Sequence, residues 1–235
     1  MTLAGAVVVV AGAGGGAGPA VAHAMAAEGA TLVLAGHSLN GVESLAAEIN
    51  AAGGAAHAFA IDLLDSAAVA EWASGVIGQF GRVDGLVHLV GGWRGGKSIV
   101  ETDLADWDWL SGRLVHTVQH ASRGFHDALK ASPVGRFVLV SSVEATRPTA
   151  TNASYAAAKA AAEAWTLALA DSFRGSQAAA TVVVVKALVT PAMREAKPDA
   201  KFPGFTDVAV LAEIIVDLWS KRADELNGER VWLTT

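Results

Sequence analysis

A cluster of glycines directly after a short apolar segment restricts the fold of this chain more than any other feature. Residues 6–10 read AVVVV, and five of the eight residues from Ala11 to Gly18 are glycine. A continuous apolar run is typical of a strand whose two faces are both covered, as in a parallel sheet. Glycines after it allow a tight strand-to-helix turn, where backbone N–H groups and the helix dipole can bind a phosphate group. We therefore expect a phosphate-binding turn made by Gly12, Gly16 and Gly18, the alternative being a glycine-rich turn without a ligand.

The rest of the chain alternates between strand and helix patterns. We expect strands at residues 6–10, 31–35, 55–60, 83–90, 136–140, 181–185 and 230–233. Helices are expected at residues 19–28, 40–52, 65–80, from 102 or 103 onward, and at 154–173 and 207–220. Strands separated by helices form right-handed βαβ units in a parallel sheet. The expected fold class is α/β: a doubly wound Rossmann-type parallel sheet of about seven strands with helices on both faces, formed by residues 1–235 as a single domain.

Local signals mark two helix starts and one irregular stretch. Asn40 with Glu43 three residues later resembles a capping box, and Asp65 is placed to cap the following helix. Residues 191–205 contain three prolines and follow a strand end. We expect this stretch to be a loop that covers the site.

Composition excludes several classes of protein. Hydrophobic residues make up 52% and charged residues 17% of the chain, which excludes disorder, and the absence of cysteine excludes disulfides and thiolate metal sites. The net charge of −6 argues against a nucleic-acid partner. The apolar N-terminal segment has no basic residue in it, and no stretch reaches the ~18 apolar residues of a membrane helix. We expect a cytoplasmic protein with no membrane, nucleic-acid or metal partner.

Three polar residues in the second half of the chain form a candidate catalytic group. Tyr155 and Lys159 are four residues apart on an expected helix, so their side chains lie on one face. A tyrosine hydroxyl titrates near ~10, and a lysine ammonium beside it favours the phenolate and permits proton exchange closer to neutral pH. Ser142 ends an expected strand at the carboxyl edge, where open α/β sheets bind ligands. Together they predict acid–base chemistry on a substrate oxygen; the Tyr–Lys spacing alone also fits a surface pair.

These motifs together resemble the short-chain dehydrogenase/reductase family over essentially the full length of the chain. Residues 11–18 are similar to the family's T-G-x-x-x-G-x-G, with alanine in place of the threonine, and Ser142 lies thirteen residues before Tyr155, the family's usual interval. The resemblance implies that Tyr155 is the general acid/base. It implies that Lys159 lowers the pKa of Tyr155 and holds the nicotinamide ribose, that Ser142 orients the substrate oxygen, and that Thr190 contacts the nicotinamide carboxamide.

The chain departs from the family pattern around the expected active site. The family's N-N-A-G after the fourth strand is replaced by HLVG at residues 88–91, in which only Gly91 is retained as a cofactor-binding candidate. The helix asparagine that supports the family's lysine through water falls on Leu114, whose side chain forms no hydrogen bonds. Ser111 and His116 are close in sequence and are candidates to substitute for it. We expect each to be an ordinary helix residue.

The residues that choose between NAD and NADP carry neither of the usual charges. An acidic residue at the end of the second strand selects NAD, and a basic residue selects NADP, but residues 35–38 read AGHS. The first lysine or arginine of the chain is Arg82, so His37 is the one basic side chain in this segment. Because a 2′-phosphate needs a cation, we expect NAD or NADP as cofactor with a preference for NAD. Asp62 and Leu63, at the end of the third strand, are expected at the adenine; Asp62 fits a loop cap equally well.

The sequence thus predicts a NAD(P)-dependent oxidoreductase of the carbonyl reductase or alcohol dehydrogenase type, acting on a small-molecule carbonyl or alcohol. The alternative is a dinucleotide-binding regulatory protein with little catalysis, favoured by Leu114 and by residues 185–186, Val-Lys in place of the family's P-G. Arg94 and Lys97 fit either an anionic substrate group or a solvated basic loop. The resemblance implies a homo-oligomer, a tetramer or dimer, for which Ala156–Ala162 offers a small-residue helix face.

Overall fold

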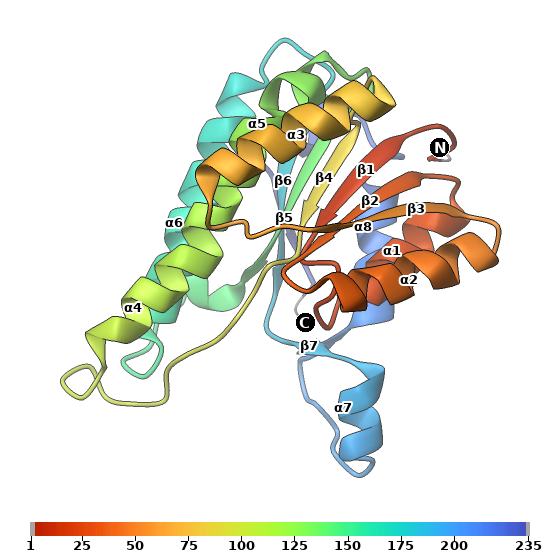
Figure 1. Ribbon diagram of the computed structural model, residues 1–235. Coiled ribbons are helices and arrows are strands. Elements are labelled where there is room, and N and C mark those ends of the chain that lie inside the picture. Colours follow the sequence, from red (N-terminus) through yellow and green to blue (C-terminus); the bar gives the residue numbers. More distant parts are fainter. Residues whose placement is uncertain (1–2, 234–235) are drawn as a thin grey trace.

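A parallel sheet of seven strands runs through the centre of the computed structural model, which describes residues 3–233 (Figure 1). The strand order is β3-β2-β1-β4-β5-β6-β9, and all neighbouring pairs are parallel. The strands are β1 (Val7–Ala11), β2 (Thr31–Gly36), β3 (Ala55–Ala60), β4 (Gly85–His88), β5 (Arg136–Ser142), β6 (Ala179–Val185) and β9 (Arg230–Trp232). The order reverses between β1 and β4, and such sheets bind ligands at the carboxyl ends of the strands where this happens. The expected fold class is confirmed.

Helices cover both faces of the sheet (Figure 1). One face is covered by α1 (Gly18–Ala27), α2 (Leu39–Ala51) and α8 (Val208–Asp217), and the other by α3 (Ser66–Phe80), α5 (Thr117–Ala131) and α6 (Ala153–Ser172). Val8 of β1 belongs to the same core cluster as Met25 of α1, whereas Val9 belongs to the cluster that contains Phe125 of α5. Because successive strand residues point to opposite faces, the valines of β1 fill two cores. No helix within residues 3–233 is long and apolar enough to span a membrane.

The two expected helix caps have different outcomes. Asp65 accepts hydrogen bonds from the backbone N–H groups of Ala67 and Ala68 and caps α3, as predicted. The capping box at Asn40 was wrong. Ser38 is the last extended residue and α2 begins at Leu39, so Asn40 already lies inside the first turn.

The long helix after β4 contains a widened turn that the sequence pattern does not reveal. Asp103 caps α4 (Leu104–Ser111) by accepting a hydrogen bond from the N–H of Ala105, which confirms the expected start. A π-helical turn, Gly112–His116, then joins α4 to α5. Single π-turns inside α-helices occur frequently at functional sites.

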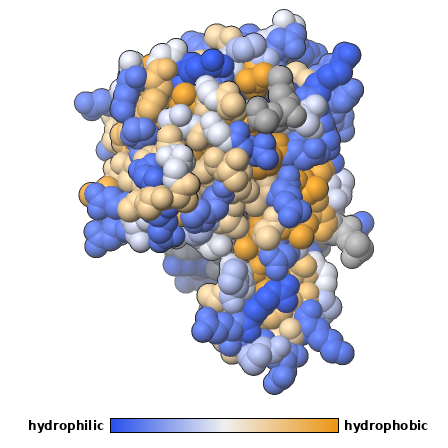
Figure 2. Space-filling view, turned by 90° about the vertical axis from the view of Figure 1, so that its right-hand side faces the viewer, coloured by the Kyte–Doolittle hydropathy of each residue, from blue (hydrophilic) through white to orange (hydrophobic). Residues whose placement is uncertain are grey.

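The stretch after β6 is only partly irregular. Pro191–Ala196 form the short helix α7, and at its base β7 (Leu188–Val189) pairs with β8 (Thr206–Asp207). The hydroxyl of Thr190 caps α7, and Pro191 opens it because the first turn needs no N–H donor there. The expectation of a loop was therefore wrong for residues 191–196. α7 projects from the body of the molecule (Figure 1), and hydrophilic residues cover the tip of this projection (Figure 2).

Candidate active site

The glycine turn between β1 and α1 brings backbone segments closer together than side chains would allow. Gly12 has φ +83°, and a Cβ built on it would lie 2.9 Å from the backbone nitrogen of Val90. A Cβ on Gly18 would overlap the carbonyl of Ala13. No side chain caps the start of α1 and its first turn has no acidic residue, so the positive end of the helix dipole faces the turn uncompensated. This arrangement suits an anion.

A cavity of about 420 Å³ opens beside this turn at the carboxyl edge of the sheet. Of the residues predicted to bind a cofactor, Gly12, His37, Asp62, Leu63 and Gly91 line it. The cavity has the size of a small-molecule site and lies at the point where the strand order reverses. The structure thus brings together residues from the ends of four strands that the sequence analysis placed at one site.

Two hydrogen bonds hold the loop after β3 in place. Asp62 accepts a hydrogen bond of 2.9 Å from the N–H of Leu64, and Nδ1 of His120 lies 2.9 Å from the carbonyl oxygen of Leu63. Asp62 therefore shapes the loop and also lines the cavity. Its contact with an adenine stays a prediction. His120 was not identified from the sequence, because it lies 57 residues from Leu63 and no local pattern connects them.

Gly16, Gly18 and Thr190 lie next to the cavity rather than in its lining. A Cβ on Gly16 would lie 3.1 Å from Cγ2 of Thr190, which places the residue that caps α7 directly beside the glycine turn. The base of α7 is thus part of the same site. The contact of Thr190 with a nicotinamide carboxamide stays a prediction.

Arg113 is a cavity residue that sequence reasoning missed. It belongs to the π-helical turn, and it is the one lysine or arginine among the cavity-lining residues within the described range 3–233. Its guanidinium carbon lies 4.7 Å from the centre of the Trp109 ring. A cation for the cofactor was expected only near the end of the second strand, whereas folding brings Arg113 to the cavity from 76 residues further along the chain than His37.

The three candidate catalytic residues lie where the carboxyl end of β5 meets the first turns of α6. Ser142 is the last residue of β5 and is buried, and its Oγ accepts a hydrogen bond of 3.3 Å from the N–H of Glu144. Tyr155 and Lys159 lie one turn apart near the start of α6. The side chain of Ser142 lies close enough to Tyr155 to act on the pKa of its hydroxyl. The grouping expected from the sequence is present.

Burial dominates the pKa values of this group. It raises the pKa of Tyr155 to about 12, against the lowering effect of the hydrogen bond with Ser142 and with a further increase from the charge of Glu144. Burial lowers the pKa of Lys159 to about 8, and the carboxylate of Glu163 opposes this shift. The expectation that Lys159 lowers the pKa of Tyr155 is thus outweighed by desolvation, which disfavours the phenolate. At neutral pH Tyr155 is a protonated phenol.

Lys159 is held by a hydrogen bond to β5 and lies one helical turn from a buried carboxylate. Its Nζ donates a hydrogen bond of 2.9 Å to the carbonyl oxygen of Val140 in β5. Glu163, one turn further along α6 and 2% exposed, accepts hydrogen bonds from Oγ of Ser141 at 2.6 Å and from Nε of Arg230 at 2.7 Å. Sequence reasoning did not single out Glu163, although its spacing of four residues from Lys159 places both on one helix face.

The position of the family's helix asparagine is apolar in the structure as well. Leu114 is buried and packs with Leu110, Ala158 and Tyr155. The hydroxyl of Ser111 donates to the carbonyl of Asp108 in its own helix. His116 is exposed and stacks on His120. Both therefore behave as ordinary helix residues, as expected.

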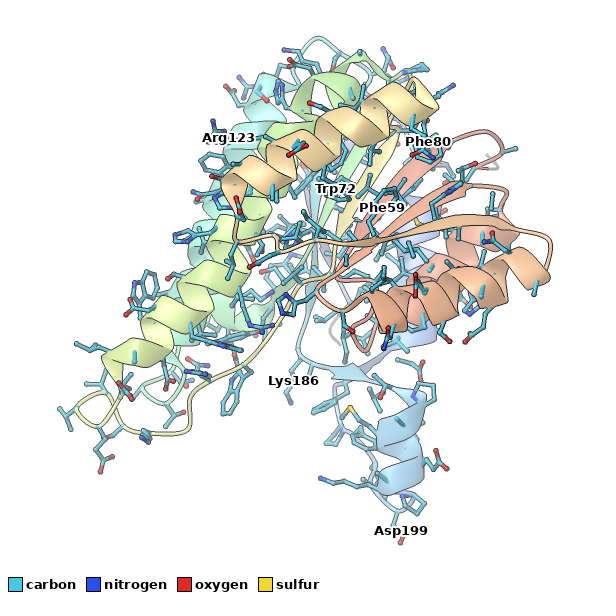
Figure 3. The ribbon with its side chains drawn as sticks, viewed as in Figure 1. Phe59, Trp72, Phe80, Arg123, Lys186 and Asp199 are labelled. Atoms are coloured by element: carbon cyan, nitrogen blue, oxygen red, sulfur yellow. The ribbon has the colours of Figure 1, made fainter. Side chains whose placement is uncertain are left out.

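On the expected substrate side, Arg94 of the basic loop after β4 is paired with a neighbouring carboxylate. Arg94 forms an ion pair of 3.0 Å with Asp106 and stacks on the Trp109 ring at 4.3 Å. Trp93 is 57% exposed. Lys186, which replaces a family glycine, lies at the end of β6 close to the base of α7 (Figure 3). The paired state of Arg94 favours the structural interpretation of this loop over recognition of an anionic group.

The glycine turn, the cavity at the strand-order reversal and the Ser–Tyr–Lys group together define a nucleotide-binding oxidoreductase of the α/β class. Comparison with known families specifies it further: the model of the short chain dehydrogenase family matches residues 6–201, and the chain belongs to this family.

Individual relatives agree with this assignment. The 2,3-dihydro-2,3-dihydroxybenzoate dehydrogenase of Bacillus subtilis strain 168 is 32% identical over 167 residues, which are 70% of this chain and 63% of the relative. A metagenomic short-chain oxidoreductase solved in complex with NADP has a TM-score of 0.81 and 27% identity, and the match covers 100% of both chains. An NAD⁺-bound xylitol dehydrogenase has a TM-score of 0.85 at 18% identity, covers 100% of this chain and 99% of its own, and shares the fold.

Proposed function

We propose that this protein interconverts an alcohol and a carbonyl compound with a nicotinamide dinucleotide, using Tyr155 as the acid/base. The observation that carries the proposal is the position of Tyr155, one helical turn from Lys159 and next to Ser142, at the carboxyl edge of the sheet where the glycine-lined cavity opens. Family membership over residues 6–201 supports the same class of reaction.

The residues around the cavity fit the parts of a dinucleotide. The turn at Gly12–Gly18 leaves backbone uncovered for a pyrophosphate, since a Cβ at Gly12 or Gly18 would meet other backbone atoms. His37, Ser38 and Asp62 line the cavity. His37 and Ser38 would offer hydrogen bonds to a ribose, and the Asp62 loop would face the adenine. Tyr155 and Lys159 would hold the second ribose, and Thr190 the carboxamide. When bound, the nicotinamide ring gives or accepts the hydride at the substrate carbon.

Proton transfer is the part of the reaction that this chain's own side chains perform. With a pKa of about 12, Tyr155 holds its proton at neutral pH and can donate it to the oxygen of a bound carbonyl. Ser142 donates a hydrogen bond to the same oxygen and fixes its position. The ammonium of Lys159 then stabilises the phenolate that the transfer leaves behind.

We further propose NAD as the preferred cofactor. His37 and Ser38, at the end of β2, have no permanent charge, and a 2′-OH needs only a hydrogen bond there. Arg113 enters the cavity from the helix over β4 rather than from β2. Fluorescence titration with NADH and NADPH tests this: tighter binding of NADH is expected, and tighter binding of NADPH would reverse the assignment.

The reaction is tested with a panel of ketones and alcohols and both cofactors. Turnover of at least one pair is expected, and its loss in Tyr155→Phe with cofactor affinity retained would identify the acid/base. The second candidate, a dinucleotide-binding regulatory protein, is favoured by the apolar Leu114 beside Tyr155. Firm dinucleotide binding without turnover of any substrate in the panel would select it.

The protein is also proposed to act as a homo-oligomer, a dimer or tetramer. Small residues of α6, Ala153, Ala156, Ala157 and Ala160, line a shallow depression of about 440 Å³ together with Ile99, which is 64% exposed. Close helix packing across such a face buries apolar surface. Light scattering at a monomer mass would contradict this proposal.

A further inference from the structure

His88 has a buried imidazole whose two ring nitrogens form no hydrogen bond with the described residues. It is the last residue of β4, its side chain is 0% exposed, and neither ring nitrogen has a hydrogen-bond partner among the described residues. Buried polar groups in folded proteins are nearly always paired, because an unpaired one costs free energy. A histidine kept in this state calls for an explanation other than packing.

The position of His88 in the sheet directs it toward Lys159. Leu86 belongs to the core cluster between the sheet and α5, and His88, two residues further along β4, lies on the same face. His88 pairs in register with Leu139 of β5, and Nζ of Lys159 is bound to the carbonyl of the next residue, Val140. Burial lowers the pKa of the His88 imidazole most, the charge of Lys159 lowers it further, and the backbone groups of Thr117 and of His88 itself oppose the shift.

The other groups around Lys159 do not use all the hydrogen-bond donors of its ammonium group. The carboxylate of Glu163 is engaged by Ser141 and Arg230, and the helix above contributes the apolar side chains of Leu110 and Leu114. Val140 supplies one acceptor, whereas an ammonium group has three N–H donors.

We propose that His88 is a positioning residue for Lys159: its neutral imidazole accepts a hydrogen bond from the lysine ammonium, directly or through one water, and holds Nζ in place beside Tyr155. This inference rests on the proposed function, because the lysine acts through Tyr155. The buried imidazole would thus support Lys159, which the apolar side chain of Leu114 cannot do. Burial and Lys159 lower the pKa of His88 to about 3, so the ring stays neutral and able to accept over the whole working range of pH.

Substitution of His88 separates positioning from packing. In His88→Leu we expect kcat to fall about 10- to 100-fold, the usual effect of losing a partner that orients a functional group, with little change in the KM of the cofactor. The melting temperature should stay the same or rise, because an unpaired polar ring is replaced by an apolar side chain. His88→Asn, which keeps an acceptor, should retain most of the activity. His57→Leu, an exposed histidine on β3, is the matched control and should behave as wild type.

A second-site change makes the test specific. Leu114→Asn adds an amide beside Tyr155, so the double variant His88→Leu/Leu114→Asn should regain part of the lost kcat. A role in packing alone would predict a lower melting temperature in His88→Leu and no recovery in the double variant. Unchanged kcat in a folded His88→Leu protein overturns the inference.

An activity-independent readout distinguishes failure of this inference from failure of the proposed function. Titration of the Lys159 amine by NMR should give a lower pKa in His88→Leu than in wild type, because an acceptor that favours the ammonium is lost. The charged or titratable groups around this amine are Tyr155 and Glu163 on α6, His88 on β4, and Arg230 on β9 through Glu163. If wild type shows no turnover, the proposed function fails. An unchanged pKa of Lys159 overturns the present inference in either case.

Discussion

Nζ of Lys159 donates a hydrogen bond of 2.9 Å to the carbonyl oxygen of Val140, which ties α6 to the strand that ends in Ser142. The contact fixes the lysine without neutralising it, because the acceptor is a dipole rather than a carboxylate. The nearest negative charge is Glu163, one helical turn away and already paired with Arg230. Lys159 is therefore a buried amine held by the backbone of β5, one helical turn from Tyr155.

Removal of the Tyr155 hydroxyl should abolish turnover without loss of cofactor. In Tyr155→Phe we expect kcat to fall by about 10²- to 10⁴-fold, the contribution of a positioned general acid, because no other group donates the proton. Steady-state kinetics and a fluorescence titration of the cofactor measure both effects. A rate retained within a few fold would refute the assignment of Tyr155 as acid/base.

The rate of carbonyl reduction should fall as the pH rises through about 8. Burial lowers the pKa of Lys159 to about 8, so its amine is an ammonium below this pH and neutral above it. The neutral form cannot stabilise the Tyr155 phenolate. The dependence of kcat on pH between 6 and 10 measures this limb.

Glu163→Gln tests whether Lys159 causes this fall of kcat with rising pH. The Glu163 carboxylate raises the pKa of Lys159, so its removal should move the limb to lower pH. A limb that stays in place, or moves to higher pH, would show that another group titrates.

Arg113 should strengthen the binding of any dinucleotide that occupies the cavity. In Arg113→Gln we expect Kd to rise about tenfold, equivalent to ~1.4 kcal/mol, since one charge-assisted contact is lost. Calorimetric titration with NAD and NADP measures it. A larger effect on NADP than on NAD would place the guanidinium at the 2′-phosphate instead.

Arg123 is the matched control for this change. It lies on the same helix run, is exposed, and points outward from α5, away from the cavity (Figure 3). Arg123→Gln removes the same charge from the protein and should leave Kd unchanged. An equal loss in both variants would attribute the effect to net charge alone.

Gly12→Ala should damage both stability and cofactor binding. Gly12 has φ +83°, and the added Cβ would lie 2.9 Å from the Val90 nitrogen, so we expect a loss of about 1–3 kcal/mol in the free energy of unfolding. Urea unfolding measures it. Gly75→Ala, in the interior of α3 with no atom within 4 Å of the new Cβ, should instead stabilise by about 0.4–1 kcal/mol.

Several parts of the site were predictable because they depend on local geometry. The valines of β1 followed by glycines indicated a covered strand and a tight turn, and both are present. The capping of α3 by Asp65 was predictable for the same reason, since a cap joins residues only two or three apart. The cap of α2 was predicted at Asn40, two residues after its actual position at Ser38, because both residues are suitable cap types.

What the sequence by itself determined is the set of relations within one element or one turn. The four-residue spacing placed Tyr155 and Lys159 on one helix face, and the position of Ser142 at a strand end placed it at the ligand-binding edge. Only the tertiary structure decided which distant groups lie together: Arg113 at the cavity, and Thr190 beside Gly16. It also decided that the charge of Lys159 acts on the buried His88. It also decided the pKa of Tyr155, which burial raises although an adjacent lysine predicted the opposite. The reason is physical: desolvation and long-range contacts depend on what packs around a residue, and the packing partners come from segments far apart in the chain.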